Sequence, residues 1–228
     1  HPHDQRWHGR WNGHGHGLHL VTDRELTRGR TLTEIVAQAA AGGVTAVQLR
    51  EKTCSTREFI ELGRALSPLL QRARIPLIIN DRVDVALALQ ADGVHLGQSD
   101  MPYPEARRLL GARAIIGLSV ESLADAAAAE SYDVDYLGIS PIFATPTKAE
   151  LVNPLGLVGI SHIRAVSRHV LVAIGGINAT NAAAVMAAGA DGIAVVSAIC
   201  AAPDPFQATV LLCSRIRRKD PATPLETL

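Results

Sequence analysis

The sequence is poor in cysteine, in aromatic residues and in any excess of charge, and each shortage excludes a class of protein. Its three cysteines, Cys54, Cys200 and Cys213, are spaced too widely for a metal-ligand motif or a disulfide framework, which favours a reduced cytoplasmic protein. Acidic and basic residues number 22 each, so no basic field indicates nucleic acid. No apolar run approaches the ~20 residues of a membrane span. We expect small-molecule partners, and the sequence carries no signal for an oligomeric state.

The two ends differ in composition from the rest of the 228-residue chain. Residues 1–17 are rich in His, Gly and Arg and lack the apolar core of a signal peptide. Their histidines suit a transition metal, although the composition favours a flexible tail without a specific role. Residues 214–228 are basic, contain proline, and are interpreted in the same way. The sequence thus predicts one catalytic domain, residues 18–213, between two flexible tails.

Short apolar segments alternate with amphipathic helices along this domain. Capping boxes at Thr31–Glu34 and Ser55–Glu58 mark two helix starts. Such repeats favour a single α/β domain, a (β/α)8 TIM barrel, over an open doubly wound sheet, because no GxGxxG motif follows the first strand. The eight predicted strands are Leu18–Val21, Val44–Leu49, Pro76–Ile79, Gly93–Leu96, Ala114–Leu118, Asp135–Ile139, Val170–Ile174 and Gly192–Val196.

Basic side chains follow the second predicted strand in the sequence VQLREK. Gln48, Arg50 and Lys52 occupy alternate positions, so an extended backbone directs all three to the same side. Arginine binds phosphate oxygens bidentately and lysine supplies a point charge, which suits a phosphorylated substrate. The alternative is a solvated strand end in which Glu51 pairs with these cations. The spacing alone does not separate the two interpretations.

Aspartates follow the third and fourth predicted strands, in INDR and GQSD. Neighbouring strands of a barrel end at the same rim, which places Asp81 and Asp100 within reach of one ion. Mg²⁺ is commonly held by one or two carboxylates together with substrate phosphates and water. The alternative is that each aspartate caps the helix after it. His95 lies inside the fourth strand and is interpreted as a packing residue.

Two further segments suit an anion. The loop SPIFATPTK, residues 140–148, offers Thr145, Thr147 and Lys148 as donors, or is simply a rigid surface loop. Gly175–Gly176 and Val196–Ser197 follow the seventh and eighth strands, where barrels often bind phosphate through backbone N–H groups. Each of these two residue pairs alone is also compatible with a tight turn. Together, after the seventh and eighth strands, they favour a phosphate site.

The ordered set VQLREK, INDRVDVALALQADGVHLGQSD, GLSV, SPIFATPTK, AIGGI and VVSAI closely resembles the thiamine-phosphate synthase (thiamine-phosphate pyrophosphorylase) family from about Leu18 to Ala202. The resemblance implies a cytoplasmic transferase on a (β/α)8 barrel. It would join hydroxymethylpyrimidine diphosphate to thiazole phosphate, releasing pyrophosphate and giving thiamine phosphate by a dissociative displacement. Rival interpretations are a thiazole tautomerase-like paralogue and a non-catalytic protein that binds thiamine precursors.

The resemblance also assigns residues to roles. It implies that Asp81 and Asp100 hold Mg²⁺, and that Arg50, Lys52, Ser119 and Lys148 carry the catalytic step. The pyrimidine diphosphate would be held by Gln48, Arg50, Lys52, Asn80, Ser119 and Lys148, and the thiazole phosphate by Thr145, Thr147, Gly176, Val196 and Ser197; Leu49, Glu51 and Pro146 complete the expected substrate-binding set.

Overall fold

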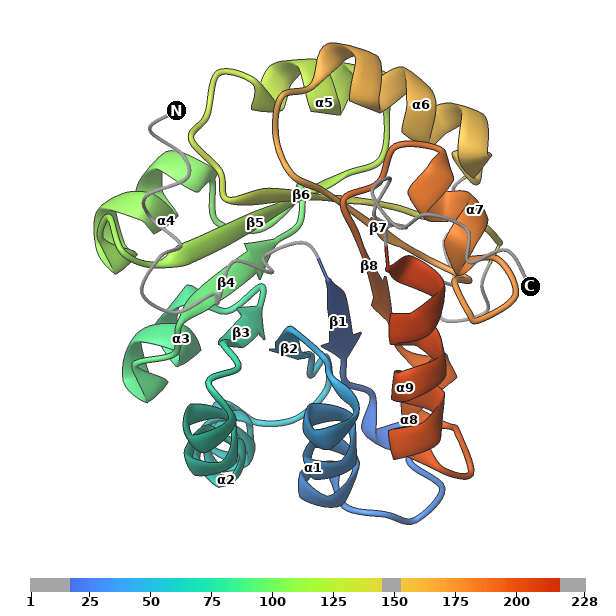
Figure 1. Ribbon diagram of the computed structural model, residues 1–228. Helices are drawn as coiled ribbons and strands as arrows, with labels where there is room; N and C mark the ends of the chain where they lie inside the picture. The colour runs from blue at the N-terminus through green and yellow to red at the C-terminus, as the bar shows by residue number, and fades with distance from the viewer. Residues whose placement is uncertain (1–16, 145–152, 218–228) are drawn as a thin grey trace, which may run out of the picture.

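The computed structural model describes residues 17–144 and 153–217, and within them the chain forms a closed barrel of parallel strands surrounded by helices (Figure 1). Each strand pairs with its neighbours in chain order, and β1 closes the ring against β8. The strands are β1 (Leu18–Val21), β2 (Ala46–Leu49), β3 (Leu77–Asn80), β4 (Gly93–Leu96), β5 (Ile115–Val120), β6 (Tyr136–Ile139), β7 (Leu171–Ile174) and β8 (Gly192–Val195). The predicted (β/α)8 fold is confirmed.

The alternation of side chains along each strand separates two cores. Leu18 and Leu20 of β1 belong to the large core between strands and helices, whereas Val21 belongs to a smaller cluster inside the barrel. The interior cluster comprises Val21, Ala46, Ile78, Ile115, Tyr136, Val172 and Ala194. Because strands of a parallel barrel are buried on both faces, they appear in the sequence as nearly continuous apolar runs.

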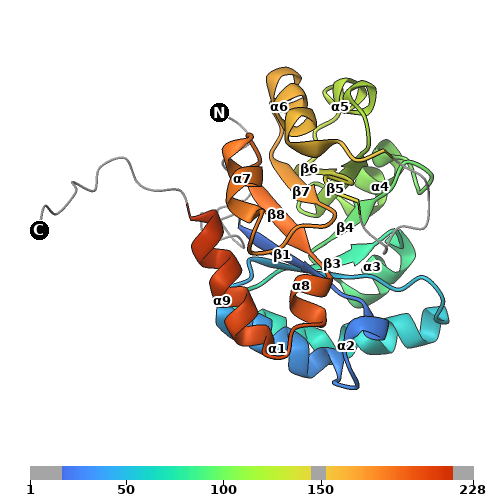
Figure 2. The ribbon, with the colours of Figure 1, turned by 90° about the vertical axis from the view of Figure 1, so that its right-hand side faces the viewer.

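The helices form the outer ring, and α9 packs between α1 and α7 (Figures 1 and 2). Thr31 and Glu34 make the predicted capping box of α1, and Gly43 ends that helix at φ 108°. Ser55 caps α2 by accepting a hydrogen bond from Glu58 N. The helices are η1 (Arg24–Leu26), α1 (Leu32–Gly42), α2 (Thr56–Ala73), α3 (Val83–Leu89), α4 (Tyr103–Leu110), α5 (Leu123–Ala129), α6 (Gly156–Val166), α7 (Ala182–Ala187), α8 (Ser197–Cys200) and α9 (Pro205–Ile216).

Helix boundaries differ from the sequence pattern in two places. The sequence pattern predicts an Ala-rich helix starting at Asn178, but Asn178 forms a side-chain turn with Thr180 and α7 begins only after Asn181. Helix α9 continues through Ile216, past the expected start of the C-terminal tail at residue 214. In the described ranges, no helix combines the length and the apolar character needed to cross a membrane.

Candidate active site

A cavity of about 150 Å³ opens at the carboxyl end of the barrel, where polar side chains from neighbouring strands meet. Gln48, Asn80 and Ser140 reach it from β2, β3 and the segment after β6, and each is about 6% exposed. The Asn80 side-chain nitrogen is buried and has no hydrogen-bond partner among the described residues. A buried donor without a partner is costly, so Asn80 is placed to bind a ligand acceptor.

Most of the predicted site residues that the structure describes lie at this mouth. Arg50 lines both the cavity and an adjoining hollow of about 610 Å³, which also contains Glu51 and Lys52. Leu49 is fully buried in the core between strands and helices, so its side chain does not reach the cavity. The predicted residues that line the cavity itself are Gln48, Arg50, Asn80, Ser119, Gly176, Val196 and Ser197.

Glu51 is bound by another part of the barrel rim. Arg24, in η1, makes two hydrogen bonds to the Glu51 carboxylate, of 2.9 and 2.8 Å, and a third of 2.6 Å to Glu58. The Glu51 side chain is only 6% exposed, so its charge is committed to Arg24. This clamp joins the segments after β1 and β2, and Glu51 neutralises Arg24 rather than Arg50 or Lys52.

Asp81 and Asp100 come together at the rim, and neither caps a helix. Arg82 is the N-cap of α3 and Pro102 that of α4, both without a side-chain capping bond, which excludes the capping alternative. Lys52 makes an ion pair with Asp81. Burial, followed by the Asp81 carboxyl within hydrogen-bonding reach, raises the pKa of Asp100. Two carboxylates this close repel each other unless a cation lies between them.

The backbone at Asp81 is held in the left-handed region, with φ 64°. Its N–H donates to the carbonyl of His95 at 2.8 Å, which ties the turn to β4. A non-glycine residue in this conformation is uncommon, and such strain tends to collect at functional sites. Here the turn brings a carboxylate to the rim directly after a buried strand.

The carboxylate pair fits Mg²⁺. Carboxylate oxygens are the hard ligands that Mg²⁺ prefers, and this ion usually takes only one or two of them, leaving positions for phosphate and water. Within residues 17–144 and 153–217, no cluster of three His, Cys, Asp or Glu side chains has metal-ligand geometry. Asp81 and Asp100 therefore suit a metal that binds together with a phosphorylated substrate rather than a closed structural metal.

The segments after β7 and β8 also reach the cavity, as the sequence predicts. Gly175 and Gly176 adopt φ values of 107° and 64°, and Val196 and Ser197 lie beside them in the cavity lining. The Phe143 N–H donates to the Gly175 carbonyl at 3.1 Å, so the glycine turn packs on the start of the 140–148 loop. Thr145, Pro146, Thr147 and Lys148 lie outside the described residues.

A sequence model described as thiamine monophosphate synthase matches residues 18–199, most of the chain. The chain belongs to the thiamine monophosphate synthase family. It is 57% identical to the thiamine-phosphate synthase of Albidiferax ferrireducens over 195 residues, 86% of this chain and 89% of that protein. The thiamine-phosphate synthase of Chloroflexus aurantiacus is 54% identical over 190 residues, 82% and 86% of the two chains. The predicted family and its transferase class are confirmed.

Solved structures agree with this family assignment. The thiamine phosphate pyrophosphorylase of Pyrococcus furiosus superposes with a TM-score of 0.81 at 41% identity, covering 89% of this chain and 96% of that one. A 3-hexulose-6-phosphate synthase superposes with a TM-score of 0.64 at 16% identity, covering 88% and 99%, and supports the barrel fold alone.

His95, interpreted from sequence as a packing residue, also lines the cavity. Its ring stacks on Tyr136, and its Nε2 lies 2.8 Å from Ser119 Oγ. The sequence does contain a sign of this position, in the glycines of GLSV and YLGI on the next two strands. A Cβ at Gly117 or Gly138 would lie 2.6 Å from the His95 ring, so both glycines make room for it.

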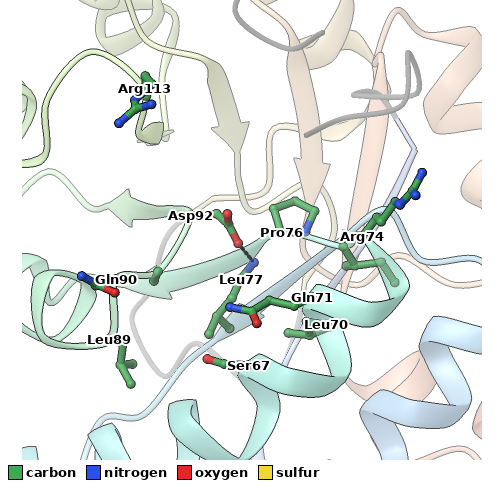
Figure 3. Close-up of a pocket in the computed structure, with 12 residues that line it drawn as sticks. Ser67, Leu70, Gln71, Arg74, Pro76, Leu77, Leu89, Gln90, Asp92 and Arg113 are labelled. Carbon is green, nitrogen blue, oxygen red and sulfur yellow. Dashed lines mark hydrogen bonds between the residues drawn. The ribbon is translucent and has the colours of Figure 1, made fainter. Parts of the chain in front are cut away.

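A second hollow, of about 770 Å³, lies at the amino ends of β3 and β4, opposite the mouth (Figure 3). It runs from Ser67 and Arg74 near the end of α2 to Arg113 before β5. Asp92 accepts a hydrogen bond of 2.9 Å from Leu77 N at its centre, which joins the two strand starts. None of the predicted site residues that the structure describes lines it, and barrels of this kind perform their chemistry at the other end.

Proposed function

We propose that this chain joins hydroxymethylpyrimidine diphosphate to thiazole phosphate, producing thiamine phosphate and pyrophosphate. The observation that carries the proposal is the juxtaposition of the Asp81–Asp100 carboxylate pair with Arg50 and Lys52 at one cavity mouth. A pair of carboxylates beside a pair of cations suits a diphosphate bound with a metal. Family membership supplies the reaction, and this juxtaposition supports a diphosphate as one of its substrates.

The reacting step needs positioning and charge neutralisation more than proton transfer. Loss of the diphosphate leaves positive charge on the pyrimidine methylene carbon, which the electron-rich aminopyrimidine stabilises, and the thiazole nitrogen then attacks that carbon. Arg50 and Lys52 would neutralise the departing diphosphate, with Lys148 as a third cation in the proposed set. Asn80 and Gln48 would hold the pyrimidine ring, and Ser119 would donate to the diphosphate, so that the two reactants are held in the geometry of the reaction.

Asp81 and Asp100 are the residues that would hold Mg²⁺. When bound there, the ion would neutralise charge on the diphosphate oxygens as the bond to carbon breaks. Lys52 would add its positive charge at the same rim, where it already makes an ion pair with Asp81.

The thiazole phosphate is assigned to the opposite side of the cavity. Gly176, Val196 and Ser197 lie together there, and the lack of a side chain at Gly176 lets a phosphate approach its backbone closely. By the family resemblance, Thr145 and Thr147 would also bind this phosphate.

A direct assay tests the proposed reaction. Purified protein is incubated with both precursors and Mg²⁺, and both products are quantified. We expect thiamine phosphate and pyrophosphate to form in equal amounts. A thiazole tautomerase would instead isomerise a thiazole carboxylate phosphate without pyrimidine diphosphate, and a binding protein would show affinity without turnover. Absence of thiamine phosphate with demonstrably folded protein would refute the proposal.

Gly176→Ala tests the thiazole phosphate subsite. At φ 64° a new Cβ would lie 2.9 Å from Phe143 Cβ and 3.1 Å from the Ala144 carbonyl. We expect the unfolding free energy to fall by about 1–2 kcal/mol and the KM for thiazole phosphate to rise. Gly29→Ala is the matched control, because its φ is 81° and no described atom lies within 4 Å of the added methyl group. Equal thiazole KM values in the two variants would contradict the subsite.

A further inference from the structure

A chain of hydrogen-bonding side chains crosses the barrel interior and ends at the cavity. Tyr136 of β6 places its hydroxyl 3.0 Å from His95 Nδ1 on β4, and His95 Nε2 lies 2.8 Å from Ser119 Oγ on β5. These three neighbouring strands lie side by side in the barrel (Figure 1). Ser119 and His95 line the cavity, whereas Tyr136 is 3% exposed and belongs to the interior cluster beneath it.

The barrel is shaped around this chain. A Cβ at Gly117 would lie 2.5 Å from the Tyr136 hydroxyl and 2.6 Å from His95 Nδ1, at the hydrogen bond itself. The His95 ring stacks on the Tyr136 ring with centroids 5.4 Å apart, and His19 meets the same ring edge-on at 5.4 Å. The Tyr136 ring is therefore held on two sides, and its hydroxyl is fixed opposite His95 Nδ1.

The direction of these hydrogen bonds has two self-consistent solutions. A neutral imidazole has one N–H donor and one acceptor nitrogen, while both hydroxyls can donate and accept. In the first solution Tyr136 donates to Nδ1, His95 donates from Nε2 to Ser119, and the Ser119 proton is available to the cavity. In the second, every bond runs the other way and Ser119 offers only a lone pair. The two solutions predict opposite ligand preferences at Ser119.

The proposed substrate distinguishes the two solutions. Burial, and secondly the charge of Asp135, raise the pKa of Tyr136, so the phenol keeps its proton and can donate it. A diphosphate presents only acceptor oxygens, so it requires the solution in which Ser119 has a free proton. In that solution Tyr136 is the donor to His95 Nδ1. The Gln98 side chain also donates to the Ser119 carbonyl at 2.6 Å, which fixes the backbone at the end of the chain.

We propose that Tyr136 is a positioning residue that holds His95 in the Nε2–H tautomer, so that Ser119 presents its hydroxyl proton to the pyrimidine diphosphate. This inference rests on the proposed function, because a diphosphate carries only acceptor oxygens and a serine lone pair there would repel it.

Tyr136→Phe removes the one hydroxyl that fixes the tautomer and keeps the ring. We expect kcat/KM for pyrimidine diphosphate to fall about tenfold, the worth of one oriented hydrogen bond, with KM for thiazole phosphate unchanged. Since Tyr136 acts through Ser119, adding Tyr136→Phe to Ser119→Ala should cause no further loss. Tyr103→Phe is the matched control, because it also deletes a buried hydroxyl, bonded to the Asp133 carbonyl at 2.6 Å, but far from the cavity. Full additivity in the double variant would overturn the proposal.

The tautomer itself can be read without substrate, which separates this inference from the proposed reaction. Long-range ¹H–¹⁵N spectra of the ¹⁵N-labelled full chain, with the His95 signals identified by their loss in His95→Gln, report which ring nitrogen carries hydrogen. We expect a hydrogen-bearing Nε2 and a bare Nδ1 in the wild type, and a mixture in Tyr136→Phe. A hydrogen on Nδ1 in the wild type would mean that the hydrogen bonds run in the opposite direction. That result would refute the proposal even if the protein makes thiamine phosphate.

Discussion

Asp81→Asn is expected to lower kcat/KM by about 10²–10³, the range found when one preorganised charge-stabilising group is removed, and to raise the Mg²⁺ concentration needed for half-maximal activity. Asparagine keeps the shape of the side chain and tolerates the φ of 64° at this position, so the turn after β3 should survive. What changes is the charge. The carboxylate pair becomes a single carboxylate, and Lys52 loses its ion-pair partner.

A matched variant isolates the metal role from a general loss of acidic charge. Asp84→Asn removes a carboxylate three residues away, on α3, that pairs with Arg82 and is 61% exposed in its side chain. We expect near-normal kcat/KM and an unchanged Mg²⁺ titration for that variant. An Asp81→Asn enzyme whose Mg²⁺ titration matches the wild type would remove Asp81 from the proposed metal site, whatever its effect on turnover.

The sequence predicted the parts of the site that depend on strand order and failed where side chains meet across the barrel. Asp81 and Asp100 could be paired in advance, because neighbouring strands of a barrel end at one rim. Their alternative role as helix caps could not be excluded until Arg82 was seen to be the N-cap of α3 and Pro102 that of α4. Which residue caps a helix depends on the backbone geometry of a few residues at the turn. The hydrophobic periodicity of the sequence does not predict that geometry.

His95 and Glu51 show the limits of a residue-by-residue argument. A lone histidine in an apolar strand carries no sign of its partners, and Ser119 and Tyr136 come from two other strands. Glu51 lies within the VQLREK motif and was expected to bind substrate, yet its side chain is committed to Arg24 from the segment after β1. In both cases the partner is more than 20 residues away, which sequence spacing does not reveal. Among the residues that the structure describes, Arg50 is the charged side chain of the motif that makes no ion pair.

Arg50→Ala is expected to cause the other large loss, about 10²–10³ in kcat/KM, with a higher KM for pyrimidine diphosphate. Arg24 is neutralised by Glu51 and Glu58, and Lys52 by Asp81, but no described carboxylate pairs with the Arg50 guanidinium. A guanidinium at a cavity mouth that pairs with no carboxylate of the described residues is available for an anionic ligand, which in the proposed reaction is the diphosphate. The expected loss follows from removing that charge where the leaving group develops its own.

Arg50→Lys then distinguishes charge from geometry. Lysine keeps the positive charge but cannot bind two phosphate oxygens in parallel, so we expect it to recover only part of the activity lost in Arg50→Ala. Arg64→Ala, an exposed arginine on α2, is the control for loss of positive charge on the surface, and its kinetics should match the wild type. Steady-state rates at varied pyrimidine diphosphate measure all three. Full recovery by lysine would show that Arg50 acts as a point charge, and wild-type kinetics in Arg50→Ala would place the diphosphate elsewhere on the rim.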